Sequence, residues 1–347
     1  MRIHSSRATA LAALALSVSL LSACGGEDTG GDSGDGDSGG GDIALTMLPK
    51  NLGNPYFDTS TNGAEEAADE VGATIEEVGP ETGDDPAGQV PFINTVAQQG
   101  ADGLIVSAND PEAICDAIAE ARDAGVKVVT FDSDTNPDCR DLFINQATPE
   151  GIAAKQLELI SEQIGGSGEI AILSAAANAT NQNAWIEMME AELKSNSAYK
   201  DIELVDIVYG DDQDQKSFDQ TEALLQNHPD LKGIISPTTV GIAAAARYLS
   251  ESEFKGKVKL TGLGTPNEMR PYVEDGTVEA FALWNPADLG YLAVQATTAL
   301  VNGDITGEEG ETFDAGRLGE FEVSADGVVL LGEPFVFDEK NIEEFDF

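Results

Sequence analysis

The sequence is short of positive charge, histidine and cysteine. Its 347 residues include 18 lysines and arginines against 63 acids, two histidines and three cysteines, and the formal net charge is -45 at pH 7. Nucleic-acid binding needs lysine and arginine contacts to phosphate, so this charge excludes nucleic acid as an expected partner. The acidic balance is typical of a solvated acidic surface.

The shortage of histidine bears on catalysis. Beyond the N-terminal segment the chain has one histidine, His228, in an expected loop before Pro229, so no Ser-His or Cys-His system can be assembled and a metal site lacks its usual imidazoles. No GxxxxGK[ST] loop occurs, and GLGTPN at 262–267 lacks the third glycine of a dinucleotide fingerprint. Asp132 and Asp134 are a conceivable glycosidase pair, but acids two apart after a strand are a common turn pattern. The sequence predicts neither an enzyme nor a cofactor or metal.

The N-terminus carries an apolar stretch, starting at Ala8, that is too short to span a bilayer as a stable helix. Arg2 and Arg7 precede it, and the pattern predicts a secretory signal peptide at residues 1–23. The ending Leu-Ser-Ala-Cys resembles a bacterial lipobox, in which Cys24 becomes the lipid-modified first residue. The alternative is an ordinary signal peptide with an incidental cysteine. We expect a secreted protein that is lipid-anchored to the outer face of the cell membrane.

The stretch GGEDTGGDSGDGDSGGGD follows Cys24 and contains no apolar residue. Such a composition cannot pack and repels itself, so residues 24–42 are predicted to be the lipidated cysteine with a flexible linker. The other two cysteines, Cys115 and Cys139, form an even pair in an oxidising compartment. We favour a disulfide between them, and two unpaired buried thiols are the alternative.

Short β-rich apolar runs alternate with amphipathic stretches from residue 43 onward. In the first half the predicted strands are 43–49, 74–79, 103–108 and 127–132, and the predicted helices are 57–71, 87–99 and 111–124. An apolar link at 142–146 leads to a second series, with strands 169–175, 202–210, 233–237, 259–264 and 278–285 and helices between them. A helix at 288–302 and short β-like pieces follow. This alternation predicts an α/β fold with two doubly wound, parallel-sheet lobes.

Polar and aromatic side chains follow nearly every predicted strand. Ligands bind beyond the carboxyl ends of the strands in open parallel sheets, so these residues are candidates for a site. They are Lys50, Asn54, Phe57, Asp132, Asp134, Asn181, Gln182, Trp185, Thr239, Trp284 and Asn285. Any one of them alone is more commonly a turn, cap or core residue. Together, carboxylates, amides and a lysine suit hydroxyl groups, and aromatic faces suit the C–H surface of a sugar.

Several stretches show a family resemblance that spans both predicted lobes. They are LPKNLGNPYFD, GQVPFINTVAQQGADGLIVSANDP, FDSDTNPDCR, NATNQNAW, SPTTVGIAAAA, GLGTPNEMRPYVEDGTV and LWNPADLGY. They resemble the sugar-type periplasmic binding proteins of ABC importers, and within them the rhamnose-binding and autoinducer-2-binding receptors. The resemblance implies a type I clamp that is monomeric, binds a small sugar or sugar-like ligand and delivers it to ABC permease subunits. Three crossings are expected near Ile144, Asn285 and Glu320, which gives an N-terminal lobe of 43–144 plus 286–319 and a C-terminal lobe of 145–285 plus 320–347.

The resemblance leaves two ligands open. An autoinducer-2 receptor is expected to carry Lys, Asp, an Asp-Gln pair and Pro-x-Ala. Four positions agree: Lys50, Asp132, Gln182 and Pro237. Three differ: Asn181, Thr239 and Asn285. NATNQNAW, SPTTVGIAAAA and WNPADLGY look like the rhamnose side, whereas the paired cysteines and MRPYVEDGTV look like the autoinducer side. An Asp-to-Asn difference replaces a pure acceptor with a group that also donates, so we favour a rhamnose-like deoxyhexose, with autoinducer-2 as the alternative.

Overall fold

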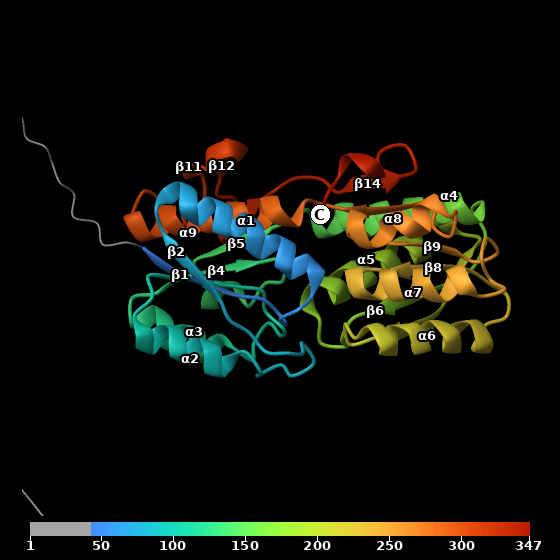
Figure 1. Cartoon of the computed structure of the whole chain (residues 1–347), viewed down its shortest axis with the longest axis horizontal. Coiled ribbons are helices and arrows are strands. Elements are labelled where there is room, and N and C mark those ends of the chain that lie inside the picture. The colour runs from blue at the N-terminus through green and yellow to red at the C-terminus, as the bar shows by residue number, and fades with distance from the viewer. Residues whose placement is uncertain (1–42) are drawn as a thin grey trace, which may run out of the picture. The chain divides into compact units, whose positions relative to one another are not determined.

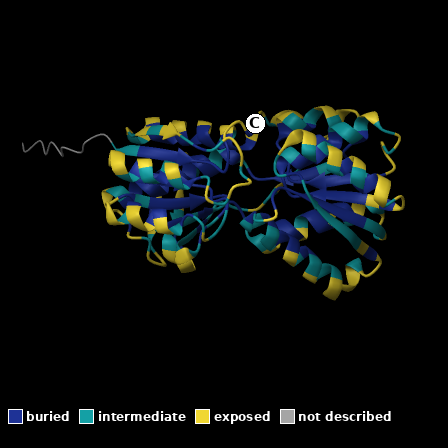
Figure 2. Ribbon diagram, turned by 90° about the horizontal axis from the view of Figure 1, so that it is seen from below, coloured by how far each residue is buried: buried dark blue, intermediate teal, exposed yellow. Residues whose placement is uncertain are grey.

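A computed structural model describes residues 43–347 of the chain. The predictions for the signal peptide, Cys24 and the linker therefore lie outside the described residues. The described part contains two parallel sheets with helices on both faces of each, which confirms the two-lobed α/β prediction (Figure 1). Figure 2 shows that burial is concentrated in the sheets and that exposed residues lie mainly on outer helix faces and loops. No helix of residues 43–347 is long and apolar enough to cross a membrane.

The first lobe is built on a six-stranded sheet in the order β13-β5-β4-β3-β1-β2, in which every pairing is parallel. Its strands are β1 (Ala44–Leu48), β2 (Thr74–Glu77), β3 (Gly103–Val106), β4 (Lys127–Phe131), β5 (Leu142–Asn145) and β13 (Val328–Leu330). Helices α1 (Pro55–Val71) and α9 (Pro286–Asn302) cover one face, and α2 (Val90–Gln99) and α3 (Cys115–Asp123) cover the other (Figure 1). β11 (Thr312–Asp314) and β12 (Glu320–Glu322) form a separate antiparallel pair.

The second lobe is built on a parallel sheet in the order β7-β6-β8-β9. Its strands are β6 (Gly168–Ser174), β7 (Ile202–Tyr209), β8 (Leu231–Ser236) and β9 (Lys259–Gly262). β10 (Ala280–Leu283) joins β9 through one parallel bridge and pairs antiparallel with β14 (Phe335–Asp338). The helices are α4 (Pro149–Ile164) and α5 (Thr180–Ser195), which contact each other, and the neighbouring α6 (Asp214–Asn227), α7 (Thr239–Glu251) and α8 (Pro266–Glu274).

Local chemistry sets the ends of the helices. The Asn54 side chain accepts a hydrogen bond of 3.1 Å from the Tyr56 amide, and Pro55 occupies the first helical turn, so α1 begins there. Gly72 ends the same helix at φ 72°, a conformation that favours glycine. The same asymmetry, an oxygen cap at the start and glycine at the end, recurs in α4 and α9.

Three local expectations differ from the structure. Residues 142–145 of the expected link form strand β5, which lies between β4 and β13 in the first sheet. The third crossing between lobes lies at residues 331–334 rather than near Glu320, because β13 pairs in register with β5 before β14 joins the second lobe. The third helix begins at Cys115, and Asp110 instead accepts from the amides of Glu112 and Ala113 in the preceding turn.

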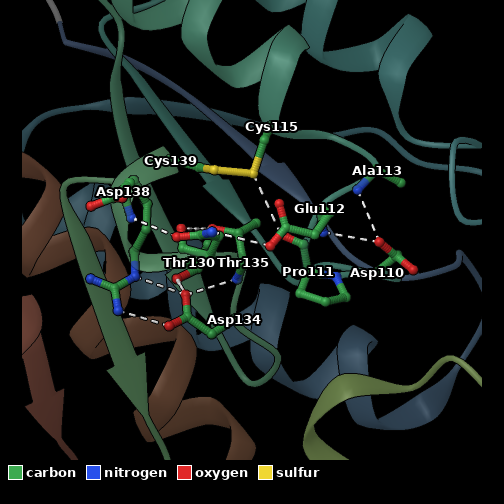
Figure 3. The surroundings of a disulfide bond; sticks show 12 residues. Asp110, Pro111, Glu112, Ala113, Cys115, Thr130, Asp134, Thr135, Asp138 and Cys139 are labelled. Carbon is green, nitrogen blue, oxygen red and sulfur yellow. Dashed lines mark hydrogen bonds and ion pairs between the residues drawn. A yellow bond between two sulfur atoms is a disulfide. The ribbon is translucent and has the colours of Figure 1, made fainter.

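A disulfide joins Cys115, the first residue of α3, to Cys139 (Figure 3). The same two segments are linked by the Asn136 amide, which donates to the Pro111 carbonyl at 2.8 Å, and by the Asn136 side chain, which donates to Glu112 at 3.1 Å. The loop after β4 is therefore attached to the segment between β3 and α3 by the disulfide and by several hydrogen bonds, which also include the Ser133 carbonyl accepting from the Ala108 amide at 2.9 Å.

Helices α1 and α9 approach each other closely through glycine. A Cβ added at Gly290 would lie 1.9 Å from the Ser60 carbonyl oxygen, and one at Gly63 would lie 1.9 Å from the Ala287 carbonyl oxygen. Because these neighbours are backbone atoms, neither position has room for a side chain. This contact places α9, which follows the second crossing, against the first lobe.

Gly290→Ala should destabilise the protein. Helix propensity alone would stabilise it by up to about 1 kcal/mol, whereas the clash with Ser60 should cost about 1 to 3 kcal/mol. We expect a lower thermal unfolding midpoint by circular dichroism. An unchanged or raised midpoint would show that the two helices separate easily at this point.

Candidate functional site

A cavity of about 370 Å³ lies between the two lobes, at the carboxyl ends of both sheets. Residues from the first lobe, from the second lobe and from the β10–α9 crossing line it. They are Lys50, Asn54, Tyr56, Phe57, Asp132, Asn181, Gln182, Trp185, Asp212, Pro237, Thr238, Thr239, Leu263, Leu283 and Trp284. Ten of the twelve residues predicted for a site thus line one cavity, and the ligand-binding role of each stays a prediction.

Lys50, Asp132 and Asn181 form the polar centre of this cavity. Lys50 Nζ lies 3.5 Å from Asp132 Oδ2 and donates to Asn181 Oδ1 at 3.1 Å. Asn181 Nδ2 contacts the Asp132 carbonyl oxygen at 3.3 Å and Oδ1 at 3.4 Å. Lys50 and Asp132 belong to the first lobe and Asn181 to the start of α5 in the second, so this group of contacts links the lobes.

Asp132 follows β4 with φ 59°, a left-handed conformation that is uncommon for a residue other than glycine. Its carboxylate accepts from Ser107 Oγ at 2.8 Å and from Tyr56 Oη at 3.2 Å, and its backbone carbonyl accepts from Gln146 at 3.1 Å. These bonds come from the ends of β3 and β5 and from the first turn of α1. The strained backbone is therefore held by its surroundings, which is common at functional sites.

Four aromatic side chains in the cavity lining, Tyr56, Phe57, Trp185 and Trp284, form an aromatic wall. Trp284 Nε1 donates to Tyr56 Oη at 2.9 Å, and the two rings meet edge to face with centroids 6.1 Å apart. Trp185 lies against Trp284 at 6.2 Å, and Phe57 lies against Tyr56 at 5.1 Å. Burial, and then the negative charge of Asp132, raise the pKa of Tyr56, so its hydroxyl stays a donor at neutral pH.

Gln182 is held in one orientation by its own lobe. Its Oε1 accepts from Ser174 Oγ and from the Ala175 amide, both at 2.8 Å. The hydrogen bonds of the side chain within residues 43–347 all use this oxygen, so the Nε2 donor is left for a group inside the cavity. A fixed donor of this kind discriminates between patterns of hydroxyl groups.

Asp212 lines the cavity although the sequence analysis did not select it. Burial raises the pKa of its carboxyl, against the opposing effects of a hydrogen bond from Thr238 and the charge of Lys50. Asp132 and Asp211 add to the rise. The sequence does contain the signal that marked the other candidates, an acidic residue after a predicted strand, because Asp212 follows the strand at 202–210. The sequence Gly-Asp-Asp is also typical of a turn, however.

Two predicted residues lie outside this cavity. Asp134 accepts from Arg140 Nε at 2.8 Å and Nη2 at 2.7 Å, and also from Thr130 (Figure 3). Asn285 caps α9 by accepting from the Ala287 amide at 3.0 Å. Both side chains thus have structural partners, and a role of either in ligand binding stays a prediction. In addition, residues 43–347 contain no group of three or more His, Cys, Asp and Glu arranged to hold a metal.

The profile of the periplasmic binding protein domain matches residues 43–305, so the chain belongs to this family. Three solved structures are similar, each over 88% of this chain. The sugar ABC transporter from Actinomyces odontolyticus ATCC 17982 is 55% identical, with a TM-score of 0.72 over 98% of that chain. An ABC transporter solute-binding protein from Clostridium phytofermentas with bound L-rhamnose is 39% identical, with a TM-score of 0.84 over 98% of that chain. LsrB from Clostridium saccharobutylicum in complex with AI-2 is 25% identical, with a TM-score of 0.83 over 100% of that chain.

Asp134→Ala should lower the stability of the ligand-free protein. The Arg140 side chain is 2% exposed, and removal of its carboxylate partner leaves a buried charge, at a cost of about 3 kcal/mol or more. Asp138→Ala is the matched control, because that side chain is exposed. Thermal unfolding should show a large fall in the midpoint for the first variant and little change for the second; equal midpoints would contradict the structural role.

Proposed function

We propose that the protein is the solute-binding component of an ABC importer and that it captures a monosaccharide between its lobes. The observation that carries the proposal is an interlobe cavity that is lined by both an aromatic wall and a polar centre. Family membership and the sugar ABC transporter at 55% identity support it. The proposed activity is binding and release of an unchanged solute at the outer face of the cell membrane.

The two sides of the cavity suit the two sides of a pyranose. Trp185, Trp284 and Phe57 offer apolar area to C–H groups, since aromatic rings bury much surface with little loss of conformational entropy. Lys50 and Gln182 can donate to sugar oxygens, and Asp132 can accept from hydroxyl groups. A sugar in this position would contact both lobes at once and so favour their closure.

We favour a rhamnose-like deoxyhexose. Leu263 and Leu283 line the cavity beside the aromatic wall and provide an apolar surface for a methyl group that a fully hydroxylated hexose lacks. Asn181 and Thr239, at which the sequence departs from the autoinducer-2 pattern, also line the cavity. The 39% identical protein with bound L-rhamnose supports this choice. Autoinducer-2 is the second candidate, supported by the 25% identical complex.

The proposal includes how the protein reaches its partners. The sequence pattern that ends at Cys24 supports a signal peptide and a lipid anchor to the membrane. The domain boundaries, with the third crossing moved to 331–334, also belong to the proposal, as does a monomer that docks on ABC permease subunits. The lobes are the units that would move when the ligand binds.

Calorimetric titration with a sugar panel tests the ligand. We expect L-rhamnose to bind more tightly than L-mannose, which differs by one hydroxyl at the position of the methyl group, by about 1 to 3 kcal/mol. Synthetic autoinducer-2 is the second arm of the titration. Heat with autoinducer-2 but not with sugars would select the second candidate, and no heat with either would refute the proposed function.

Asn181→Ala should weaken sugar binding about tenfold, because the cavity loses an amide that contacts both Lys50 and Asp132. The ligand-free unfolding midpoint should change little, since these contacts are between lobes. Asn183→Ala is the matched control from the same helix, because the Asn183 amide bonds to the Ala177 carbonyl of its own lobe. Titration calorimetry gives the affinities, and equal affinity in both variants would remove Asn181 from the site.

A further inference from the structure

A second, smaller cavity adjoins the first one. Its free space is about 310 Å³, open solvent included, and it shares Lys50 and Asp212 with the first cavity, called the sugar cavity below because of its proposed ligand. Its other lining residues come from both lobes: Asn51, Gly83, Asn109, Ala175, Ala176, Ala179 and Asp211. No aromatic ring lines it, so its surroundings differ from those of the sugar cavity.

Two buried oxygens in this cavity have no partner among the described residues. Asn51 is 8% exposed and Asn109 is 2% exposed, and the side-chain Oδ1 atom of each accepts no hydrogen bond. The amide nitrogens are engaged, since Asn109 Nδ2 donates to the Lys50 carbonyl at 3.0 Å and Asn51 Nδ2 donates to the Leu52 carbonyl at 3.4 Å. A buried unpaired acceptor is costly, which indicates an occupant that interacts with both oxygens.

Gly83 shows where these oxygens converge. A Cβ placed on it would lie 3.2 Å from Asn109 Oδ1, 3.7 Å from Asn51 Oδ1 and 3.7 Å from the Lys50 carbonyl oxygen. Three oxygens of the first lobe thus lie within 4 Å of one point beside Gly83, where a methyl group would contact all three and would be tight against Asn109 Oδ1. The backbone φ of Gly83 is not in the left-handed region, so conformation alone does not require glycine here.

The charges around the cavity favour a positive occupant. Asp211 and Asp212 line it from the second lobe, and Asp132 of the first lobe lies in the neighbouring cavity, which shares Lys50 and Asp212 with this one. Lys216 pairs with Asp211, and the Lys50 ammonium is directed to Asn181 and Asp132. Three carboxylates therefore face two ammonium groups, which leaves one negative charge unbalanced.

We propose that the second cavity binds a small oxygen-preferring cation, with Ca²⁺ as the first candidate. The amide oxygens of Asn51 and Asn109 and the carboxylates of Asp211 and Asp212 form the hard oxygen set that Ca²⁺ takes. The set has only two carboxylates, so it differs from a cluster of acids or histidines. Because its members come from both lobes, the cation stabilises lobe closure and tightens ligand binding in the neighbouring cavity.

The test uses thermal unfolding of the full protein after dialysis against a chelator, with no sugar present. We expect the midpoint to rise with added CaCl₂ at fixed ionic strength. Gly83→Ala places a methyl group where the oxygens converge and should weaken Ca²⁺ binding by about tenfold or more. Gly79→Ala is the matched control, since its Cβ would meet only side-chain atoms at 3.4 Å or farther.

Each outcome decides the proposal. The proposal is supported if CaCl₂ raises the unfolding midpoint of the wild-type protein and of Gly79→Ala but not that of Gly83→Ala. Equal increases of the midpoint in all three proteins would mean general ion binding to the acidic surface and would overturn the proposal. No increase in any protein would mean that water is the hydrogen-bond partner of the two asparagine oxygens, which would also overturn it. Asn51→Leu, which removes the Oδ1 atom at similar volume, is the second variant if Gly83→Ala does not fold. MgCl₂ and NaCl arms identify the ion, and the readout is independent of whether a sugar binds.

Discussion

The contacts of Asp132 are the interaction on which the cleft depends. Its carboxylate accepts from Ser107 and Tyr56 and lies beside Lys50, while Asn181 reaches it from the second lobe. In a water-poor cleft such bonds are strong when they are all made and costly when one is lost. These contacts, from the ends of β3 and β5 and from the first turn of α1, hold the left-handed backbone at this position.

The start of α5 connects ligand contact with lobe closure. Asn181 and Gln182 line the first interlobe cavity, while Asn178, three residues before Asn181, donates to the Asn109 carbonyl of the first lobe at 3.0 Å. One short segment therefore carries both the groups that would meet a ligand and a group that joins the lobes. A ligand that fixes this segment would shift the conformational population toward the closed form, and no other structural element would be needed for this shift.

The sequence predicted the repeated strands and helices well, because buried parallel strands read as short apolar runs and helix caps are local signals. The expectation that a site forms beyond the carboxyl ends of the strands correctly placed Lys50, Asp132 and Gln182 beside one cavity. It failed where the partner is distant in sequence. Strand β13 has three residues and pairs with β5, far away in the chain, so no local pattern could assign it to the first lobe. Asp134 was selected beside Asp132, but its role is set by Arg140.

The chain is strongly acidic, yet the cleft depends on one lysine. Lys50 and Asp212 form the boundary between the two cavities, so a charge in either cavity acts on both. Burial already raises the pKa of Asp212, which means that its charged form is poorly compensated where it stands. A hydroxyl group that donates to Asp212 from one side and a positive charge on the other side would each relieve the same carboxylate. Binding of the proposed occupants would therefore be coupled through these shared side chains, and such a coupling is reciprocal.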